Sequence, residues 1–334
     1  MNVLIDRIAV VVHVYYPELW MELADCIRRV DVPYDLFITY SDESSVEKAR
    51  IDFPEAIFIQ CENKGYDIWP FLKILNGLDL RKYTHIIKLH TKRDIFTEGL
   101  CSINSVDLRG NKWRSRLLSF ISSKNAWEKT KRKITEDSAV GMIADPFLLF
   151  KRRDVKIAIS TFDKALSIVK NLGIEVDPRQ MQYVGGTMFM ARAECFSSLQ
   201  GKWEADDFDY ECSHADGSLA HCIERILCFC VYGSGYVISY PFDLIVKSKI
   251  RAFLKYRRLL CNFARICSFF YQRKITNKGY IIIKVLKIPI VYYGASSKNT
   301  VSRCTLISMN KMSKIVDWYD ANLNDNHRGV LGCK

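Results

Sequence analysis

Three basic side chains alternate along the segment "THIIKLHTKRD", residues 84–94. Lys88, His90 and Lys92 occupy every second position, so they share one face if the segment is a β-strand. A row of cations at a strand end would stabilise a diphosphate, the role that a carboxylate-bound metal ion plays in many sugar-nucleotide enzymes. A solvated strand end with surface lysines is the alternative, although a lysine inside so apolar a run fits it less well.

The segment "ENKGYDIWPF", residues 62–71, offers polar groups of another kind. Asn63 and Gly65 follow an apolar run, and Asp67 stands at the start of a helical pattern. Glycine lets the backbone turn tightly or lets a ligand approach closely, while the amide and carboxylate suit a ribose, a base edge or a helix-start amide. A turn between strand and helix, with Asp67 as the N-cap, explains the same residues without a ligand.

Two motifs in the second half of the chain add further candidates. Gly185 and Gly186 in "YVGGTMFMAR" would let a sugar or acceptor ring lie against the backbone, although a β-bulge or bend explains a glycine pair more simply. In "DGSLAHCIER", His221 and Glu224 share one face of a predicted helix, and Asp216 stands at its start. A carboxylate near an imidazole can act as a general base. A helix cap with an ion pair to a neighbouring helix is the alternative.

These motifs lie among elements that alternate in type. Apolar runs predict strands at 7–16, 34–41, 56–63 and 84–92, and helical periodicity predicts helices at 18–30, 43–51 and 67–78. Further on we expect helices at 113–123, 160–173 and 216–235, a strand and loop at 140–150, one strand at 181–196 and a last strand at 236–242. The pattern predicts one Rossmann-type α/β domain over residues 1–245, with a mixed, mainly parallel central sheet between layers of helices.

The carboxyl ends of the strands indicate where a ligand would bind, because open α/β sheets bind ligands beyond those ends. The predicted ends are residues 13–16, 41–42, 62–67 and 90–94. They add His13, Tyr15 and Asp42 to the candidates. Polar side chains from four separate pieces of chain converge on one crevice, which predicts an enzyme.

The positive charge of the chain belongs to one segment. The 334 residues are 49% hydrophobic and 26% charged, as expected of a globular protein. Residues 247–287 hold 12 basic and no acidic residues, which equals the whole net charge of +12. Aromatic residues and leucines lie between these cations, which predicts a basic amphipathic, helical C-terminal region over 246–334 that binds an anionic membrane surface. A helix packed on the first domain with a charged outer face is the alternative, and nucleic acid, supported by charge alone, is not an expected partner.

Several other classes fit the sequence less well. The sequence contains no run of about 18 apolar residues, so it predicts no membrane-spanning helix. The first residues lack the pattern of a signal peptide. The 12 cysteines are scattered, which predicts a reduced, cytoplasmic protein without a disulfide framework. HExxH, Walker and GxGxxG motifs are absent, and we predict no set of metal ligands.

Taken together, these stretches resemble the rhamnan synthesis protein F family of bacterial surface-polysaccharide enzymes. The matching stretches, within residues 7–245 and in the family's order, are "HVYYPELW", "DLFITYS", "NKGYDIWPFL", "KLHTKRD", "GGTMFMAR" and "DGSLAHCIERI". The resemblance implies glycosyl transfer, with L-rhamnose from a dTDP donor as the name-giving case, in the synthesis of O-antigen lipopolysaccharide, capsule or wall polysaccharide. With the basic segment, it implies a peripheral location on the inner face of the bacterial plasma membrane and a glycan on polyprenyl diphosphate as acceptor.

The order of elements is also similar to the GT-A glycosyltransferase architecture. On that comparison Asp216 resembles the general base of inverting enzymes. Glu224 is the second choice for the base, and His221 would orient the base or bind the sugar. The nucleotide-sugar site that we expect comprises His13, Tyr15, Asp42, Asn63, Gly65, Asp67, Lys88, His90, Lys92, Gly185 and Gly186.

The segment "LHTK" stands where GT-A enzymes carry an acidic metal-binding motif. This departure predicts that Lys88, His90 and Lys92 supply the charge that a metal brings to the leaving diphosphate. If Mg²⁺ or Mn²⁺ takes part, we expect oxygen ligands from Asp42, Asp67 or Asp94. Two other functions stay open: transfer of galactofuranose or another hexose from a UDP-sugar, and a non-catalytic binding module in a polysaccharide-assembly complex.

Overall fold

The structure is a computed structural model that describes residues 5–93, 111–151, 159–177, 182–209 and 217–241, with further strands at 271–275, 281–285 and 288–293. Its internal contacts divide the chain into two units, Met1–Leu244 and Ile245–Lys334, each of which is described by itself. The separate roles that the sequence predicts for the two parts of the chain stay predictions.

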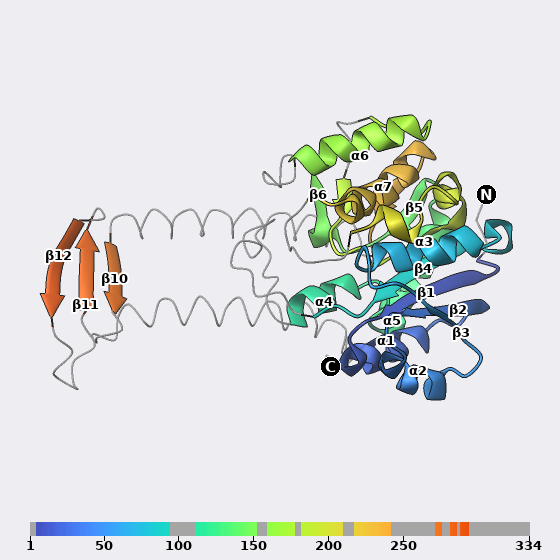
Figure 1. Ribbon diagram of the computed structural model, residues 1–334, viewed down its shortest axis with the longest axis horizontal. Helices are drawn as coiled ribbons and strands as arrows, with labels where there is room; N and C mark the ends of the chain where they lie inside the picture. The colour runs from blue at the N-terminus through green and yellow to red at the C-terminus, as the bar shows by residue number, and fades with distance from the viewer. Residues whose placement is uncertain are drawn as a thin grey trace, which may run out of the picture. The chain divides into compact units, whose positions relative to one another are not determined.

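A central sheet organises the first unit, with the described strands in the order β3-β2-β1-β4-β8-β5-β9 (Figure 1). The strands are β1 Ile8–Val14, β2 Tyr34–Tyr40, β3 Ile57–Gln60, β4 His85–His90, β5 Val140–Ile143, β8 Phe189–Arg192 and β9 Val237–Ser239. Parallel pairs join β1 to β2 and β4, β2 to β3 and β5 to β9, whereas β8 is antiparallel to β4 and β5. The mixed, mainly parallel sheet that the sequence predicts is confirmed. Every residue of β1 is buried, as expected of a strand covered on both faces.

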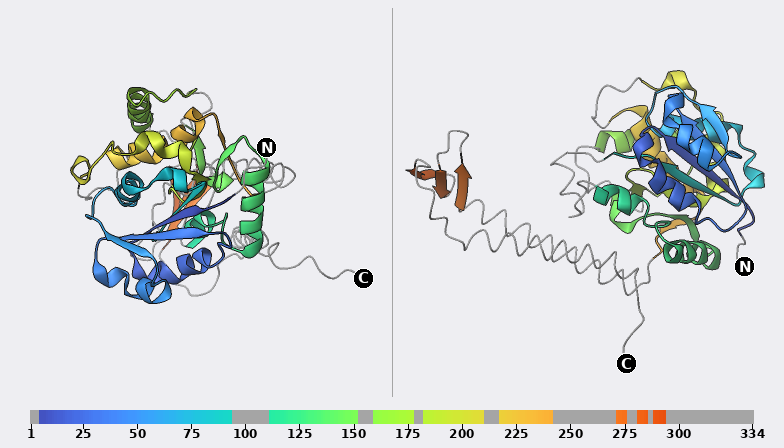
Figure 2. Two further views of the ribbon diagram at one scale, coloured as in Figure 1. Left: turned by 90° about the vertical axis from the view of Figure 1, so that its right-hand side faces the viewer. Right: turned by 90° about the horizontal axis from the view of Figure 1, so that it is seen from below.

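Helices cover both faces of this sheet. The helices described in the first unit are α1 Trp20–Ile27, α2 Glu47–Asp52, α3 Ile68–Gly77, α4 Asn111–Leu117, α5 Lys124–Glu136, α6 Ile159–Asn171 and α7 Leu219–Gly233. Short 3-10 helices are η1 Pro17–Leu19, η2 Glu43–Ser45, η3 Leu80–Lys82, η5 Pro146–Leu148, η8 Ala193–Leu199 and η9 Ala205–Asp207. Helices α3 and α7 lie on one face, and α1 and α2 lie on the other (Figures 1 and 2). Pro70 lies in the first turn of α3, where its missing N–H leaves no hydrogen bond unmade.

Residues 181–196 do not form the single strand that the sequence predicts. Strand β7, Gln182–Val184, pairs with β6, Leu149–Lys151, in a separate two-stranded sheet, and β8 begins only at Phe189. Between them the φ angles of Gly186 and Thr187 are +89° and +47°, and this left-handed backbone ends the extended chain. The bend that was the simpler interpretation of the glycine pair is therefore correct.

The described residues of the second unit form an antiparallel sheet of β10 Tyr271–Ile275, β11 Ile281–Val285 and β12 Ile288–Tyr293. The prediction of a helical extension is wrong for these residues, and the rest of 246–334 lies outside the described residues. The stretch "YIIIKVLKIPIVYY", residues 280–293, is rich in β-branched and aromatic side chains, which favour strands over helices. Within the part of the chain that the structure describes, no helix has the length and apolar character needed to cross a membrane.

Candidate functional site

Four polar side chains form a row across the carboxyl edge of the central sheet. Thr39 of β2 pairs with His13 of β1, and His13 pairs with His90 of β4, so their side chains share one face. Thr187 lies beside them, because its hydroxyl contacts Oδ2 of Asp67, an oxygen that is 3.7 Å from Nε2 of His90. All four residues are buried, the most exposed being His13 at 7%. We call Thr39, His13, His90 and Thr187 the polar row; it lies at three strand ends that the sequence predicts to converge.

Asp67 and Lys88 form an ion pair beside the polar row, in which Lys88 is buried and Asp67 is largely buried. The Lys88 ammonium contacts Oδ2 of Asp67, lies 2.9 Å from Oγ1 of Thr187, and belongs to a side chain that is 1% exposed. Burial by itself would raise the pKa of the Asp67 carboxyl, but His90, Lys88 and Lys92 outweigh it and hold this pKa far below its usual range. Burial lowers the pKa of Lys88, and Asp67 opposes that shift. The charge of Lys88 is therefore balanced inside the protein rather than directed at solvent.

The contacts of Asp67 also decide between two interpretations of this residue. Asp67 immediately precedes α3, yet its side chain makes no capping hydrogen bond to that helix. Instead the carboxylate accepts from Lys88 and from the hydroxyl of Thr187. The interpretation of Asp67 as a side-chain N-cap is therefore wrong, and the residue belongs to the buried network.

The two histidines of the polar row are neutral at pH 7. Burial lowers the pKa of His13 and of His90 to about 4 in each case, against the opposing charge of the nearby carboxylate. Nε2 of His90 lies 2.8 Å from the carbonyl oxygen of Gly186, which can only accept, so Nε2 carries the proton. Nδ1 of His13 lies 3.1 Å from Oγ1 of Thr39, whose hydroxyl donates to the carbonyl of Val12, so the hydrogen-bond network assigns the His13 proton to Nδ1. Nδ1 of His90 and Nε2 of His13 are the unprotonated acceptors.

Lys92 and Tyr15 keep more exposed surface than the polar row. Nζ of Lys92 lies 5.1 Å from the centre of the Trp113 ring, and Tyr15 is 43% exposed with its ring centre 6.5 Å from that of His13. The backbone N–H groups of Tyr15 and Tyr16 both donate to Oγ1 of Thr91 at 2.9 Å. This threonine ties the chain beyond β1 to the chain beyond β4, and so holds Tyr15 at the rim of the site.

Asp42 and Asn63 are exposed at neighbouring strand ends. The Asp42 carboxylate accepts from the N–H of Ser44 at 3.3 Å and from its hydroxyl at 2.7 Å, which caps η2. The hydrogen bond from the Ser44 side chain lowers the pKa of Asp42. Both predicted residues therefore lie on the surface and not in the buried network.

Gly65 lies in a turn that the protein itself packs. Its φ is +61°, and a Cβ at this position would lie 2.6 Å from the ring of Phe208. Phe208 is 3% exposed and packs beside Trp69, with ring centres 5.8 Å apart. Nζ of Lys64 lies 2.9 Å from Oδ1 of Asp206, which joins η9 to the same turn. The close approach that Gly65 permits is that of a phenylalanine side chain.

The glycine pair is also packed by protein side chains. A Cβ on Gly185 would overlap the Phe150 ring, and one on Gly186 would lie 2.8 Å from Leu117. The N–H of Gly186 donates to Oε1 of Glu224 at 2.8 Å. The turn is thus fixed by packing on one side and by a carboxylate on the other.

His221 and Glu224 lie on α7 but have different partners. Nδ1 of His221 lies 2.7 Å from Oγ of Ser218, the N-cap of α7, and its ring packs edge-on against Tyr66 with centres 5.5 Å apart. The Glu224 carboxylate instead faces the glycine turn. Asp216, the predicted general base, lies outside the described residues.

Threonines complete the site, and sequence reasoning did not identify them. Thr39 and Thr187 belong to the polar row, and Thr91 joins two strand ends. Among the described residues, the non-glycine residues with positive φ are Tyr66 at +55° and Thr187 at +47°, and both adjoin Asp67. Such backbone costs about 1–3 kcal/mol at each residue and clusters at functional sites. Two features of the sequence could have identified these threonines as site residues: Thr91 directly follows His90, and Thr187 directly follows the glycine pair.

The expected metal ligands do not meet in the described residues, which contain no group of three or more His, Cys, Asp or Glu side chains able to hold a metal ion. Asp67 faces the Lys88 ammonium, Asp42 caps η2, and Asp94 lies outside the described residues. Hard cations prefer several oxygen ligands. Asp42 and Asp67 therefore do not fit a Mg²⁺ or Mn²⁺ site by themselves.

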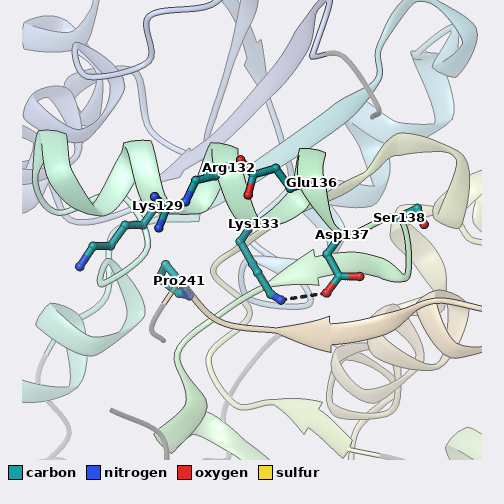
Figure 3. A pocket seen from close by; sticks show the side chains of 7 residues that line it. All are labelled: Lys129, Arg132, Lys133, Glu136, Asp137, Ser138 and Pro241. Atoms are coloured by element: carbon teal, nitrogen blue, oxygen red, sulfur yellow. Dashed lines mark hydrogen bonds and ion pairs between the residues drawn. The ribbon is translucent and has the colours of Figure 1, made fainter. Parts of the chain in front are cut away.

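A surface hollow of about 560 Å³ lies between α5 and the end of β9 (Figure 3). Lys133 and Asp137 pair within it at 2.8 Å. Basic and acidic side chains both line the hollow, and none of them belongs to the polar row. The lining residues are Lys129, Arg132, Lys133, Glu136, Asp137, Ser138 and Pro241. The hollow is therefore separate from the candidate site.

The fold and the buried polar row define an α/β domain with polar groups at the edge where such sheets bind ligands. The chain belongs to the rhamnan synthesis protein F family, whose model matches residues 2–236. This membership implies a role in polysaccharide synthesis, and it confirms the family that the sequence motifs predict.

Two curated relatives come from Xanthomonas campestris pv. campestris, and both carry the description "Uncharacterized protein WxcX". The relative from strain B100 is 26% identical over 239 residues, and that from strain ATCC 33913 is 25% identical over 239 residues. Each match covers 69% of this chain and 32% of the relative. The chain thus spans about a third of the length of these curated relatives.

Proposed function

We propose that this chain is a glycosyltransferase that moves a sugar from a nucleotide donor to a glycan acceptor. The observation that carries the proposal is the polar row with its ion pair at the carboxyl ends of β2, β1 and β4. Membership of the rhamnan synthesis protein F family supports polysaccharide synthesis as the context. Two neutral histidines with unprotonated nitrogens at this edge suit the binding of sugar hydroxyls, which a purely structural module does not require.

The proposed roles follow from burial and charge. His13 and His90 accept hydrogen bonds from sugar hydroxyls, and the exposed ring of Tyr15 stacks on the base or the sugar. Lys92 supplies positive charge to the leaving diphosphate. Asp216 accepts the proton of the acceptor hydroxyl as its oxygen attacks the anomeric carbon, an in-line displacement that inverts the anomeric centre. The donor is dTDP-L-rhamnose, in keeping with the name of the family.

The proposed acceptor is a growing glycan on polyprenyl diphosphate at the inner face of the plasma membrane. The segment 247–287, with its 12 basic and no acidic residues, supports contact with anionic lipid. Each basic residue near such a surface contributes about 1 kcal/mol. The chain would then work as a peripheral enzyme on the cytoplasmic side.

A donor screen read by mass spectrometry tests the proposal. The full chain is incubated with dTDP-rhamnose, UDP-galactofuranose and other UDP-hexoses, together with a polyprenyl-diphosphate glycan. We expect a product heavier by one deoxyhexose from dTDP-rhamnose alone. A product formed only from a UDP-sugar would move the assignment to a galactofuranosyl or other hexosyl transferase.

A non-catalytic binding module is the second candidate function. The observation that favours it is that Lys88 is balanced by Asp67, while Phe208 and Phe150 take up the space beside Gly65 and Gly185. Calorimetry with the donors and a donor-hydrolysis assay separate the two functions. A chain that binds glycan but neither binds nor cleaves any nucleotide sugar would be a binding module.

A further inference from the structure

We propose that Glu224 is a positioning residue that acts through the peptide groups of Gly186, and that it is not the proton acceptor of the reaction. This inference rests on the proposed glycosyl transfer for its kinetic consequence, but its structural content can be tested without that activity.

Both oxygens of the Glu224 carboxylate have partners. Oε1 accepts the N–H of Gly186 at 2.8 Å, and Oε2 lies 3.4 Å from NH1 of Arg225. The Arg225 side chain is 1% exposed, and its guanidinium lies 4.4 Å from the centre of the Tyr183 ring. Glu224 therefore links α7 to the turn that follows β7. Its own side chain is 18% exposed.

The opposite polar group of Gly186 is held as well. Its carbonyl oxygen lies 2.8 Å from Nε2 of His90, the protonated nitrogen of that ring. The residue is thus clamped through its N–H by α7 and through its carbonyl by β4. A buried backbone polar group without a partner is costly, so removing either side chain would release the turn.

The turn matters because Thr187 follows Gly186 directly. The hydroxyl of Thr187 contacts both Asp67 and Lys88, and its backbone is left-handed, a conformation that β-branched residues rarely adopt. Packing and hydrogen bonds must hold such a residue in place. The Glu224 carboxylate holds Thr187 in place through the N–H of Gly186, the residue before it. In this way Glu224 sets the position of the ion pair beside the polar row.

Replacing Glu224 by glutamine and by alanine separates a positioning role from a proton acceptor. The amide oxygen that Glu224→Gln introduces can still accept the N–H of Gly186, but an amide cannot take up a proton at neutral pH. The Glu224→Ala variant lacks both functions. Glu128→Ala on α5, where Glu128 pairs with Lys131 at 3.0 Å on the surface, serves as the matched control.

Hydrogen exchange of the Gly186 amide in the full chain gives the first measurement. We expect exchange at least roughly 10-fold faster in Glu224→Ala, and within about 3-fold of wild type in Glu224→Gln and in the control. Unchanged exchange in a folded Glu224→Ala variant would show that the Glu224 carboxylate does not hold the N–H of Gly186. This result does not depend on which sugar, if any, the chain transfers.

Steady-state transfer gives the second measurement. We expect Glu224→Gln to keep a substantial part of the wild-type kcat, with Glu224→Ala losing more and showing a raised donor KM. A loss of about 100-fold or more in kcat for a folded Glu224→Gln variant would instead identify Glu224 as the general base. If the wild-type chain transfers no sugar while the exchange results are as expected, the proposed function is wrong, but the positioning of Gly186 by Glu224 is confirmed.

Discussion

The hydroxyl of Thr187 donates a hydrogen bond of 2.5 Å to Oδ2 of Asp67, although 120 residues separate the two in the sequence. The bond joins the start of α3 to the turn before β8. Lys88 contacts both residues, so a buried charge and a buried hydroxyl share one carboxylate oxygen. Tyr66, directly before Asp67, has the same left-handed backbone as Thr187. The site therefore depends on cross-links between distant segments, and these cross-links can be tested one at a time.

Removing the hydroxyl of Thr187 should destabilise the protein. Thr187→Ala removes one hydrogen-bond partner from Asp67 and one from Lys88, which then have only each other in this network. We expect a loss of about 1–3 kcal/mol in the free energy of unfolding. Thr187→Ser keeps the hydroxyl and loses only a buried methyl group, so it should stay within about 1 kcal/mol of wild type. Urea unfolding of both variants measures the difference. Equal stabilities for the Ser and Ala variants would mean that the hydroxyl contributes nothing to the network.

The ion pair between Lys88 and Asp67 should behave as a unit. Lys88→Met leaves a buried carboxylate without its counter-charge, and we expect a loss of about 3–5 kcal/mol. Asp67→Asn should also destabilise, because the Lys88 ammonium is 1% exposed and loses its partner. The double variant should lose clearly less than the sum of the single variants. Strict additivity in urea unfolding, within about 0.5 kcal/mol, would show that the two charges do not depend on each other.

Buried histidines should make the fold sensitive to mild acid. His85 is 0% exposed, and neither ring nitrogen has a hydrogen-bond partner among the described residues. Burial, together with the charge of Arg192, lowers its pKa to about 3, and burial lowers the pKa of His13 and His90 to about 4. Unfolded histidine titrates near pH 6.5. The unfolded chain thus binds more protons below this pH, so stability is complete above about pH 6.5 and is lost as the pH falls toward 4 to 3.

Urea unfolding at several pH values between 7.5 and 4.5 measures this effect. Each buried histidine should contribute a slope of about 1.4 kcal/mol per pH unit. His85→Leu removes one titrating group and should give a shallower slope than wild type. The lowered pKa of Asp67 adds to the loss only below the pKa of an unfolded carboxyl, about 3.9, so it does not disturb this window. An identical slope in wild type and His85→Leu would mean that His85 is accessible to protons in the folded state.

The parts of the site that depend on local pattern were predictable from the sequence. Apolar runs correctly predicted β1, β2 and β4, and alternation correctly placed Lys88 and His90 on one face. Alternation does not say what covers that face, so the inward ion pair with Asp67 and the neutral state of His90 were not predictable. The sequence does not predict helix α5, because its side chains are mainly charged and its buried apolar residues are Ala126, Trp127 and Ile134.

Membrane binding by the basic segment is a prediction that vesicle flotation can test. We expect the full chain to float with vesicles that contain anionic lipid. With purely zwitterionic vesicles, we expect the protein to stay at the bottom of the gradient. Changing Lys255, Arg257 and Arg258 to Gln removes about 1 kcal/mol each, which should weaken binding on the order of 100-fold. The same number of substitutions on α5, at Lys124, Lys129 and Arg132, is the control. Equal flotation of the two triple variants would show that Lys255, Arg257 and Arg258 do not contribute to membrane binding.

Lys92 should matter more for the donor than Lys88 or His90, although the sequence places all three in one row. The charge of Lys88 is balanced by Asp67, and His90 is neutral. Lys92 is half-buried beside the Trp113 ring, and it is therefore the one of these three basic residues whose charge can reach a diphosphate. We expect Lys92→Met to raise the donor KM about 10-fold or more, the size of a lost hydrogen bond to a charged group, while Lys129→Met does not. Transfer should persist in EDTA if protein cations supply the charge. Loss of all activity in EDTA, with recovery in Mg²⁺ or Mn²⁺ and a normal KM for Lys92→Met, would show that a metal ion supplies it instead.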